Sequence, residues 1–173
     1  LVEAIGITAS THNAVLLDDL GDVLRPAIMW TDTRSAAEAA ELELEAGNRI
    51  FELGLQRATP TWALPRLRWL ACHEPGLLGR VHRIMFTKDF VRAALTGDWA
   101  TDRTDAQGSL LVDARAGQWS SDLCCLIPLD IKTLPPISRA TDVAGVVSRD
   151  AAARFGLPAG ARVVVGTSDS AAE

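Results

Sequence analysis

The residue of this sequence best placed for acid–base chemistry is Asp169. It lies in the segment Gly-Thr-Ser-Asp-Ser (166–170), which follows the apolar run Arg-Val-Val-Val (162–165). Such a run predicts a strand in the middle of a sheet, and the carboxyl end of such a strand is where open α/β sheets bind their ligands. A carboxylate there can act as a general base toward a substrate hydroxyl. It can equally be a cap that accepts hydrogen bonds from the first amides of a following helix, and Asp169 alone leaves both interpretations open.

A polar segment, Thr11, His12 and Asn13, interrupts two apolar stretches near the start of the chain. Hydroxyl, imidazole and amide groups can together hydrogen-bond the hydroxyls of a polyol. A single histidine at the end of a strand is also commonly a structural residue whose hydrogen bonds are made within the protein. The segment is therefore a candidate sugar site with a structural alternative.

A third polar group, formed by Trp30, Asp32 and Arg34, follows the next apolar stretch. An indole ring with a carboxylate and a guanidinium nearby can bind a sugar by stacking and by charged hydrogen bonds. The alternative is a tryptophan in the core and an aspartate that caps a helix. Residue type and spacing favour neither.

Several classes of site are excluded by the sequence. There is no Walker A loop, no Gly-x-Gly-x-x-Gly dinucleotide fingerprint and no nucleophile elbow. The three histidines, His12, His73 and His82, lack metal-ligand spacing, so no metal ligand is expected. A net charge of −5 without a cluster of lysine or arginine argues against a nucleic-acid partner. No apolar run is long enough to span a membrane, so no membrane partner is expected.

Length and composition favour one globular domain. The chain has 173 residues, of which 48% are hydrophobic and 23% charged, and this leaves room for one domain with a real core. The cysteines are odd in number, and Cys124 and Cys125 are adjacent. This pattern favours reduced thiols and a cytoplasmic protein.

Strands and helices are expected to alternate, which favours an α/β fold. The predicted strands are 3–10, expected to be buried on both faces, two within 14–30 joined by a turn at 18–22, and then 82–86, 109–113, 144–148 and 162–166. The first predicted helix runs from Ser35 to Gly47 and begins with a Ser35–Glu38 capping box, and the second has Pro65 in its first turn and ends at Pro75. The other predicted helices are 88–96, capped by Thr87, a short helix capped by Ser120, and 149–155, capped by Ser148. Residues 102–109 are predicted to form a polar loop.

Four segments, taken in order, resemble the FGGY family of carbohydrate kinases. They are IGITASTHNAVLLDDLGDVLRPAIMWTDTRS (5–35), TPTWALPRLRWLACHEP (59–75), MFTKDFVRAALTGDWATDRTDAQGSLLVDARAGQWS (85–120) and VVVGTSDSAAE (163–173). Each segment alone is a weak signal. Together, in this order and at family-like spacing, they are specific and cover nearly the whole chain.

The resemblance implies an α/β fold of the actin-like, ribonuclease-H-like kind, with a mixed sheet and flanking helices. Residues 1–173 are then expected to be most of the N-terminal sugar-binding domain, with the first phosphate-loop strands and the C-terminal ATP domain outside the chain. The implied activity is phosphorylation of a small sugar by ATP with Mg²⁺. The residues that contact ATP would lie mostly outside the chain, which is expected to be inactive alone. A homodimer is left open.

The resemblance also assigns roles to individual residues. Asp169 matches the catalytic base that deprotonates the sugar hydroxyl attacking the γ-phosphate of ATP. Thr11 and His12 match the pair that hydrogen-bonds the sugar. Trp30 matches a tryptophan that lines the same pocket, and Asp32 is its close neighbour. This chemistry needs positioning and a carboxylate more than covalent catalysis.

The sequence departs from the family pattern at two places. Arg66 stands where the family's signature has lysine, and Ser-Thr-His-Asn (10–13) replaces Gln-Met-His-Gly. The similarity is strongest to members that act on xylulose, so a ketopentose such as D-xylulose is the leading substrate, with another ketose or a polyol as the alternative. A second hypothesis is a non-catalytic actin-like domain that binds a sugar or a partner. A third is an unrelated α/β domain with Asp169 as a cap. The first two hypotheses require the side chains of His12 and Asp169 to open onto one cavity, whereas the third allows them to lie on opposite faces of the domain.

Overall fold

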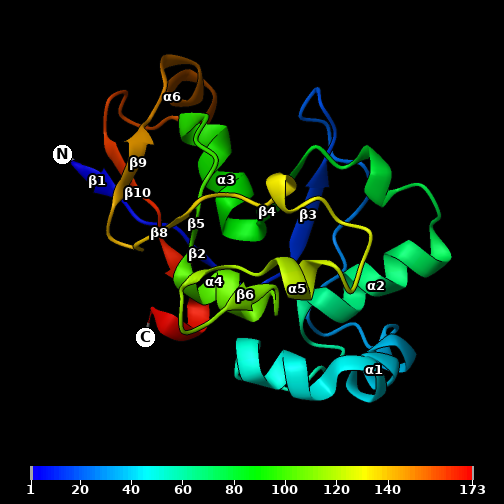
Figure 1. The fold of residues 1–173 in the computed structure, drawn as a ribbon. Helices are drawn as coiled ribbons and strands as arrows, with labels where there is room; N and C mark the ends of the chain where they lie inside the picture. Colours follow the sequence, from blue (N-terminus) through cyan, green and yellow to red (C-terminus); the bar gives the residue numbers. More distant parts are fainter. Residues whose placement is uncertain (1, 173) are drawn as a thin grey trace.

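The computed structural model of the chain describes residues 2–172 (Figure 1). The helices are α1 (Ala36–Gly54), α2 (Ala63–His73), α3 (Thr87–Thr96), α4 (Arg103–Gly108), α5 (Ser121–Cys124) and α6 (Arg149–Phe155). The strands are β1 (Ala4–Ile5), β2 (Thr8–Ala9), β3 (Ala14–Leu17), β4 (Arg83–Phe86), β5 (Thr101–Asp102), β6 (Val112–Asp113), β7 (Gln118–Trp119), β8 (Ile137–Ser138), β9 (Val143–Val146), β10 (Arg162–Val164) and β11 (Thr167–Ser168). Short 3₁₀ turns are η1 (Leu78–Arg80), η2 (Ile131–Thr133) and η3 (Asp169–Ala171).

Strand β10 lies in the middle of a mixed three-stranded sheet, between β1 and β9 (Figure 1). It pairs with β1 in parallel and with β9 in antiparallel orientation. Val163 of β10 is fully buried and packs against Leu95 of α3 and Ala151 of α6. The prediction of a central apolar strand before Asp169 is therefore confirmed, and two helices cover one side of that strand.

The predicted strand 3–10 is broken into β1 and β2 at Gly6 and Ile7. Strand β2 pairs in parallel with β11, just as β1 pairs with β10. The segments 4–9 and 162–168 therefore bend side by side, the first at Gly6 and Ile7 and the second at Gly166. Gly166 makes the second bend with a φ of +79°, and a Cβ there would collide with the carbonyl oxygen of Ile7. Only glycine fits that position. The expected burial on both faces is wrong, because Ala4 and Thr8 are exposed.

The largest hydrophobic core joins α1, α2 and the antiparallel pair β3–β4. Leu64, Leu67 and Leu70 recur at helical spacing along α2, and all three are buried there. Pro65 lies in the first turn of α2, where its missing N–H costs nothing. The predicted helix and its apolar stripe are confirmed. Burial of each such side chain stabilises the fold by roughly 1.5–3 kcal/mol.

Helix α1 extends beyond its predicted end at Gly47 and reaches Gly54. Ala46 has non-helical angles (φ −144°, ψ 16°), so the chain kinks there and then resumes the helix. The second part persists because Ile50 is fully buried in the core. Although α1 is long, neither it nor any other helix of residues 2–172 combines the length and apolar character needed to cross a bilayer.

The predicted helix caps are partly confirmed. Ser120 and Ser148 cap α5 and α6, each accepting a hydrogen bond from the amide three residues later. The capping box of Ser35 and Glu38 is wrong, because within residues 2–172 neither the Ser35 hydroxyl nor Glu38 Oε2 has a hydrogen-bond partner. Helix α1 packs against α2, and this packing places Glu38 Oε1 3.5 Å from Nδ1 of His73.

The predicted hairpin within 14–30 is only half formed. Strand β3 makes its ladder with β4, and the segment after the turn contributes a single bridge between Leu17 and Val23. The short local segment lies on the opposite edge of β3 from β4, where the Leu24 amide donates to the Leu16 carbonyl at 2.9 Å. Thr87 does not cap α3, because the helix begins at Thr87 itself and its hydroxyl donates to the carbonyl of Ser10 (2.9 Å). The predicted strand 109–113 shortens to β6.

Candidate active site

A pocket of about 260 Å³ opens between the loop after β2, the start of α2 and the helix α4. The residues that line it are Thr11, His12, Gln56, Trp62, Thr104, Gln107, Gly108 and Ser170. Hydroxyl, amide and imidazole groups offer hydrogen bonds, and an indole offers an apolar face for stacking. A pocket of this size suits a small polyhydroxylated ligand better than a nucleotide.

Asp169 stands at the rim of this pocket, at the first position of the turn η3. Its Oδ1 accepts a hydrogen bond from the amide of Ser170 at 2.8 Å and a longer one from the Thr11 hydroxyl at 3.4 Å. Thr11 and Ser170 both line the pocket, so Asp169 and His12 lie on the same side of the fold. The N-cap position of η3 is Ser168, and Asp169 is the first residue within the turn.

His12 is held in a strained backbone conformation and buried. Its φ of +47° is in the left-handed region, which a non-glycine residue occupies at a cost of about 1–2 kcal/mol. Its N–H donates to Asp105 Oδ1 (2.7 Å), and its carbonyl accepts from Arg66 (2.8 Å). The ring packs at 5.0 Å and 48° against Trp62. Both ring nitrogens are buried, and the described chain gives them no hydrogen bond of regular geometry, although the backbone of Thr61 lies close enough to the ring to affect its pKa.

Burial lowers the pKa of His12 from 6.5 to about 4, and the positive charge of Arg66 acts in the same direction. A hydrogen bond with the backbone of Thr61 and, to a smaller extent, the carboxylate of Asp169 oppose this lowering of the pKa only in part. At neutral pH the imidazole therefore carries one N–H donor and one acceptor nitrogen. A neutral ring of this kind can hydrogen-bond a hydroxyl in either direction.

The low pKa makes a testable prediction. Histidine NMR titration is expected to show His12 neutral until the pH approaches about 4. Since the folded-state pKa lies below the unfolded value of 6.5, the contribution of neutral His12 to the free energy of unfolding is complete above pH 6.5. It is lost as the pH falls to about 4. A His12→Gln variant should lack this pH dependence, and a His12 ring that titrates above pH 6 would contradict the assignment.

Arg66 is buried next to the pocket and holds the segments that form it together. Its guanidinium donates to the carbonyls of Trp62, Ile28 and His12 and to the side-chain oxygen of Asn13, at 2.7–3.1 Å. Burial lowers its pKa to about 10, which still leaves it charged at neutral pH. A planar fork of donors reaches four acceptors that a lysine ammonium could not reach together. Arg66, which stands where the family signature has lysine, thus links α2 to the loop that carries His12.

A cluster of buried charges lies behind the pocket. Lys88 is fully buried and its Nζ contacts Asp89, Asp102 and Asp105 at 2.6, 2.9 and 3.1 Å. Arg92 pairs with Asp89 at 2.7 Å. Buried charges persist only when they are paired and hydrogen-bonded, as these are. The cluster joins α3 to α4.

The prediction of a polar loop at 102–109 is wrong for this reason. The segment forms the end of β5 and the helix α4, and Asp102 caps that helix by accepting from the amides of Thr104 (3.0 Å) and Asp105 (3.4 Å). The polar side chains suggested a solvated loop. Asp102 and Asp105 are instead buried, because both pair with Lys88, which lies 14 or more residues earlier in the chain.

Electrostatic effects within the cluster differ between its members. Burial raises the pKa of Asp105 to about 6, against the opposing charge of Lys88. For Asp102 burial acts in the same direction, but the charge and hydrogen bonds of Lys88 outweigh it and the pKa is lowered. Burial alone would lower the pKa of Lys88, yet the three carboxylates raise it. Lys88 therefore stays protonated although it is buried.

The same helix contacts the segment that carries Asp169. The Thr167 hydroxyl donates to Asp102 Oδ2 at 2.9 Å and lies 3.3 Å from the Thr104 hydroxyl. Asp105, on the next part of the helix, holds the main chain of His12. Helix α4 thus fixes the two sides of the pocket relative to each other.

Trp30 and Asp32 lie apart from the pocket lining. The side chain of Trp30 is 46% exposed, and Asp32 forms a hydrogen-bonded pair with Arg34 at 2.7 Å. This pairing lowers the pKa of Asp32. Neither residue meets His12 or Asp169 in this structure, so their role in sugar binding stays a prediction. The idea of a core tryptophan at position 30 does not fit its exposure.

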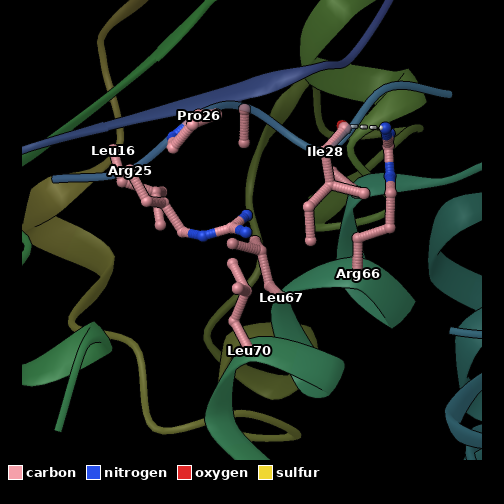
Figure 2. A pocket seen from close by; sticks show the side chains of 9 residues that line it. Leu16, Arg25, Pro26, Ile28, Arg66, Leu67 and Leu70 are labelled. Atoms are coloured by element: carbon pink, nitrogen blue, oxygen red, sulfur yellow. Dashed lines mark hydrogen bonds between the residues drawn. The ribbon is translucent and has the colours of Figure 1, made fainter. Parts of the chain in front are cut away.

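A smaller pocket lies beneath the site, between β3, the segment around Pro26 and α2 (Figure 2). Leu67 and Leu70 form its floor, and Arg25 extends toward them while its Nε pairs with Glu74 at 3.2 Å. The carbonyl of Ile28 accepts a hydrogen bond from Arg66 at 2.7 Å, which is the dashed line in Figure 2. This apolar space has little room for a ligand and belongs to the packing that supports Arg66.

No group of three or more histidine, cysteine, aspartate or glutamate side chains within residues 2–172 is arranged to hold a metal ion. The buried aspartates around Lys88 do not form such a site, because the ammonium group occupies the space between them. Cys72, Cys124 and Cys125 are free thiols. Burial raises the pKa of Cys124 to about 12, so it is an unreactive packing residue.

A comparison with known families settles the class of this fold. The model of the N-terminal domain of the FGGY family of carbohydrate kinases matches residues 1–173. The chain belongs to the FGGY family. Its mixed α/β architecture is accordingly the actin-like fold of the FGGY kinases, as the sequence predicted.

Individual FGGY relatives agree with this. The xylulose kinase of Lactococcus lactis is 34% identical over 168 residues, which are 97% of this chain and 34% of that protein. The xylulose kinase of Escherichia coli is 33% identical over 172 residues, 99% of this chain and 35% of that protein. The crystal structure of xylulose kinase from Rhodospirillum rubrum superposes with a TM-score of 0.92 at 32% identity, covering 97% of this chain and 35% of that one. The chain thus spans about a third of the curated relatives it matches.

Sequence analysis missed several residues of the site. The sequence predicts only that Trp62 lies in the loop before a helix, yet its ring lines the pocket beside His12. Gln107 and Gly108 fell in the segment predicted to be a solvated loop. The charged and small residues of 102–109, which precede an apolar run, could have suggested the helix α4. The cation that pairs with its buried aspartates, Lys88, is however remote in sequence.

Proposed function

We propose that this chain is most of the N-terminal sugar-binding domain of an ATP-dependent sugar kinase, and that D-xylulose is its leading substrate. The observation that carries the proposal is that His12 and Thr11 line one small polar pocket and that the Asp169 carboxylate lies beside it, 3.4 Å from the Thr11 hydroxyl. Similarity to proteins named xylulose kinase over nearly the whole chain supports the choice of sugar. Another ketose or a polyol is the alternative substrate.

In the proposed reaction Asp169 accepts the proton of one sugar hydroxyl. The hydroxyl oxygen forms a bond to the γ-phosphorus of ATP, and the bond from that phosphorus to the β-bridging oxygen breaks, which releases ADP. His12 and Thr11 hydrogen-bond other hydroxyls, and Trp62 covers one face of the sugar. The side chains thus orient the attacking oxygen, which is the main contribution an enzyme makes to phosphoryl transfer.

ATP and Mg²⁺ are part of the proposal, although no ligand for them is assigned to this chain. Mg²⁺ neutralises the charge that develops on the phosphates when it is bound. The described residues contain no cluster suited to a metal ion. The proposed domain arrangement places most ATP contacts on a second domain, and the chain alone is expected to lack turnover. The free cysteines support a cytoplasmic setting.

The proposal is tested by measuring ADP release from the full-length kinase with a panel of ketoses and polyols. One sugar, with D-xylulose first among those expected, should give saturable turnover. The isolated chain measured beside it should give none. If no sugar supports ADP release by the full-length protein, the kinase proposal fails and the non-catalytic sugar-binding hypothesis takes its place.

A further inference from the structure

The ring of His12 lies between the indole of Trp62 and the backbone of α4 at Gly108. A Cβ at position 108 would lie 2.6 Å from His12 Nδ1, 3.1 Å from its Cγ and 3.2 Å from its Cβ. Real Cβ atoms do not approach a ring nitrogen to 2.6 Å, so any side chain at 108 would displace the ring. The space that the His12 ring occupies thus depends on the absence of a side chain at this one position.

The backbone of Gly108 does not itself require glycine. It is the last residue of α4, and it is not among the glycines of positive φ. In a helix alanine is the more favourable residue. A glycine at a helical position without a positive φ needs another reason, and the close approach of the His12 ring supplies one.

Three residues earlier on the same helix, Asp105 holds the main chain of His12. Its Oδ1 accepts the His12 N–H at 2.7 Å, while its other oxygen pairs with Lys88 at 3.1 Å. Both carboxylate oxygens of Asp105 therefore have a defined partner. One turn of α4 fixes the strained backbone of His12 through Asp105 and the ring through Gly108.

We propose that Gly108 and Asp105 are positioning residues that aim the His12 ring into the sugar pocket. The inference rests on the proposed function, since it names what sets the geometry of that site. Asp105 holds the left-handed main chain, Gly108 leaves room for the ring, and Trp62 closes the other side. The ring nitrogens then have a fixed direction, so His12 selects a sugar by the placement of its hydroxyls.

The test is Gly108→Ala in the full-length kinase, with D-xylulose as the probe. The KM for D-xylulose is expected to rise about tenfold or more with a smaller change in kcat, because a displaced His12 loses binding that is shared by ground state and transition state. The matched control is Gly79→Ala in η1, where a Cβ would meet nothing within 4 Å and the φ is not positive. This control should leave KM and kcat within about twofold. An unchanged KM in Gly108→Ala overturns the proposal.

A double variant shows whether the effect acts through the His12 ring. In a His12→Ala background the ring is gone and only the 3.2 Å approach of the two Cβ atoms remains. Adding Gly108→Ala there should change KM by less than about twofold, so the two substitutions are strongly non-additive. Additive effects would overturn the proposal. If Gly108→Ala alone does not fold, folding of the double variant supports the proposal and its failure to fold overturns it.

A readout that needs no turnover separates this inference from the proposed function. The imidazole resonance of His12, assigned by its absence in His12→Ala, is expected to shift in Gly108→Ala and to stay unchanged in Gly79→Ala. If the wild-type enzyme does not act on D-xylulose, the proposed substrate fails, but the resonance still decides whether Gly108 positions the ring. An unshifted resonance rejects the positioning role even where the kinase activity is confirmed.

Discussion

Replacing Asp169 with alanine in the full-length kinase is expected to lower kcat for sugar phosphorylation by about 10²–10⁴-fold, the usual contribution of a general base. The carboxylate stands at the pocket rim and, among residues 2–172, accepts hydrogen bonds from the Ser170 amide and the Thr11 hydroxyl. Its loss therefore removes the proton acceptor without disturbing a buried network. Sugar affinity, measured by calorimetry, should change by less than about threefold.

The control for this prediction is Asp19→Ala, which removes another exposed carboxylate at a distance from the site. Its kcat and sugar affinity should match those of the wild type. If Asp169→Ala retains most of its activity, the carboxylate is only a backbone contact for the turn η3. If it loses sugar affinity as strongly as turnover, Asp169 is a binding residue rather than a base.

Replacing Lys88 with methionine is expected to reduce the free energy of unfolding by about 3–5 kcal/mol, the usual cost of removing one partner from a buried ion pair. Methionine is similar in length but carries no charge, so Asp102 and Asp105 lose their only buried cation contact within residues 2–172. Chemical denaturation measures the change. Lys132→Met is the control, because Lys132 is exposed and should alter stability by less than about 0.5 kcal/mol.

The pH dependence of the Lys88→Met protein gives a second check. Without the ammonium group the buried carboxylates favour their protonated form more strongly in the folded state than in the unfolded state. Their folded-state pKa is then raised, so the variant should regain stability as the pH falls from 7 toward 5. A loss equal to that of Lys132→Met, or no recovery at lower pH, would show that the cluster contributes little to folding.

The parts of the fold that the sequence predicts well are those governed by neighbouring residues. The central strand β10, the helix α2 with its leucine stripe, and the caps at Ser120 and Ser148 all depend on local pattern. Their side chains find partners within a few positions or in a continuous apolar core. The place of Asp169, just after this strand and the Gly166 turn, follows from the same local pattern, while its role as a base stays a prediction.

The parts that were predicted wrongly depend on remote partners. Residues 102–109 look solvated, but two of their charged residues, Asp102 and Asp105, are buried against Lys88. The ladder of β3 is made with β4, more than sixty residues later, whereas the segment after the turn at 18–22 contributes only one bridge. Trp62 joins the pocket only because the His12 loop folds onto the start of α2, a long-range contact that no periodicity in the sequence indicates.

The central claim is that the pocket between His12, Trp62 and Asp169 binds the sugar that is phosphorylated. A crystal structure of the full-length kinase with D-xylulose bound tests it most directly. We expect the sugar to stack on Trp62, with one hydroxyl hydrogen-bonded to a ring nitrogen of His12 and another within about 3 Å of the Asp169 carboxylate. A sugar bound elsewhere, or bound here with no hydroxyl within reach of Asp169, would contradict the account.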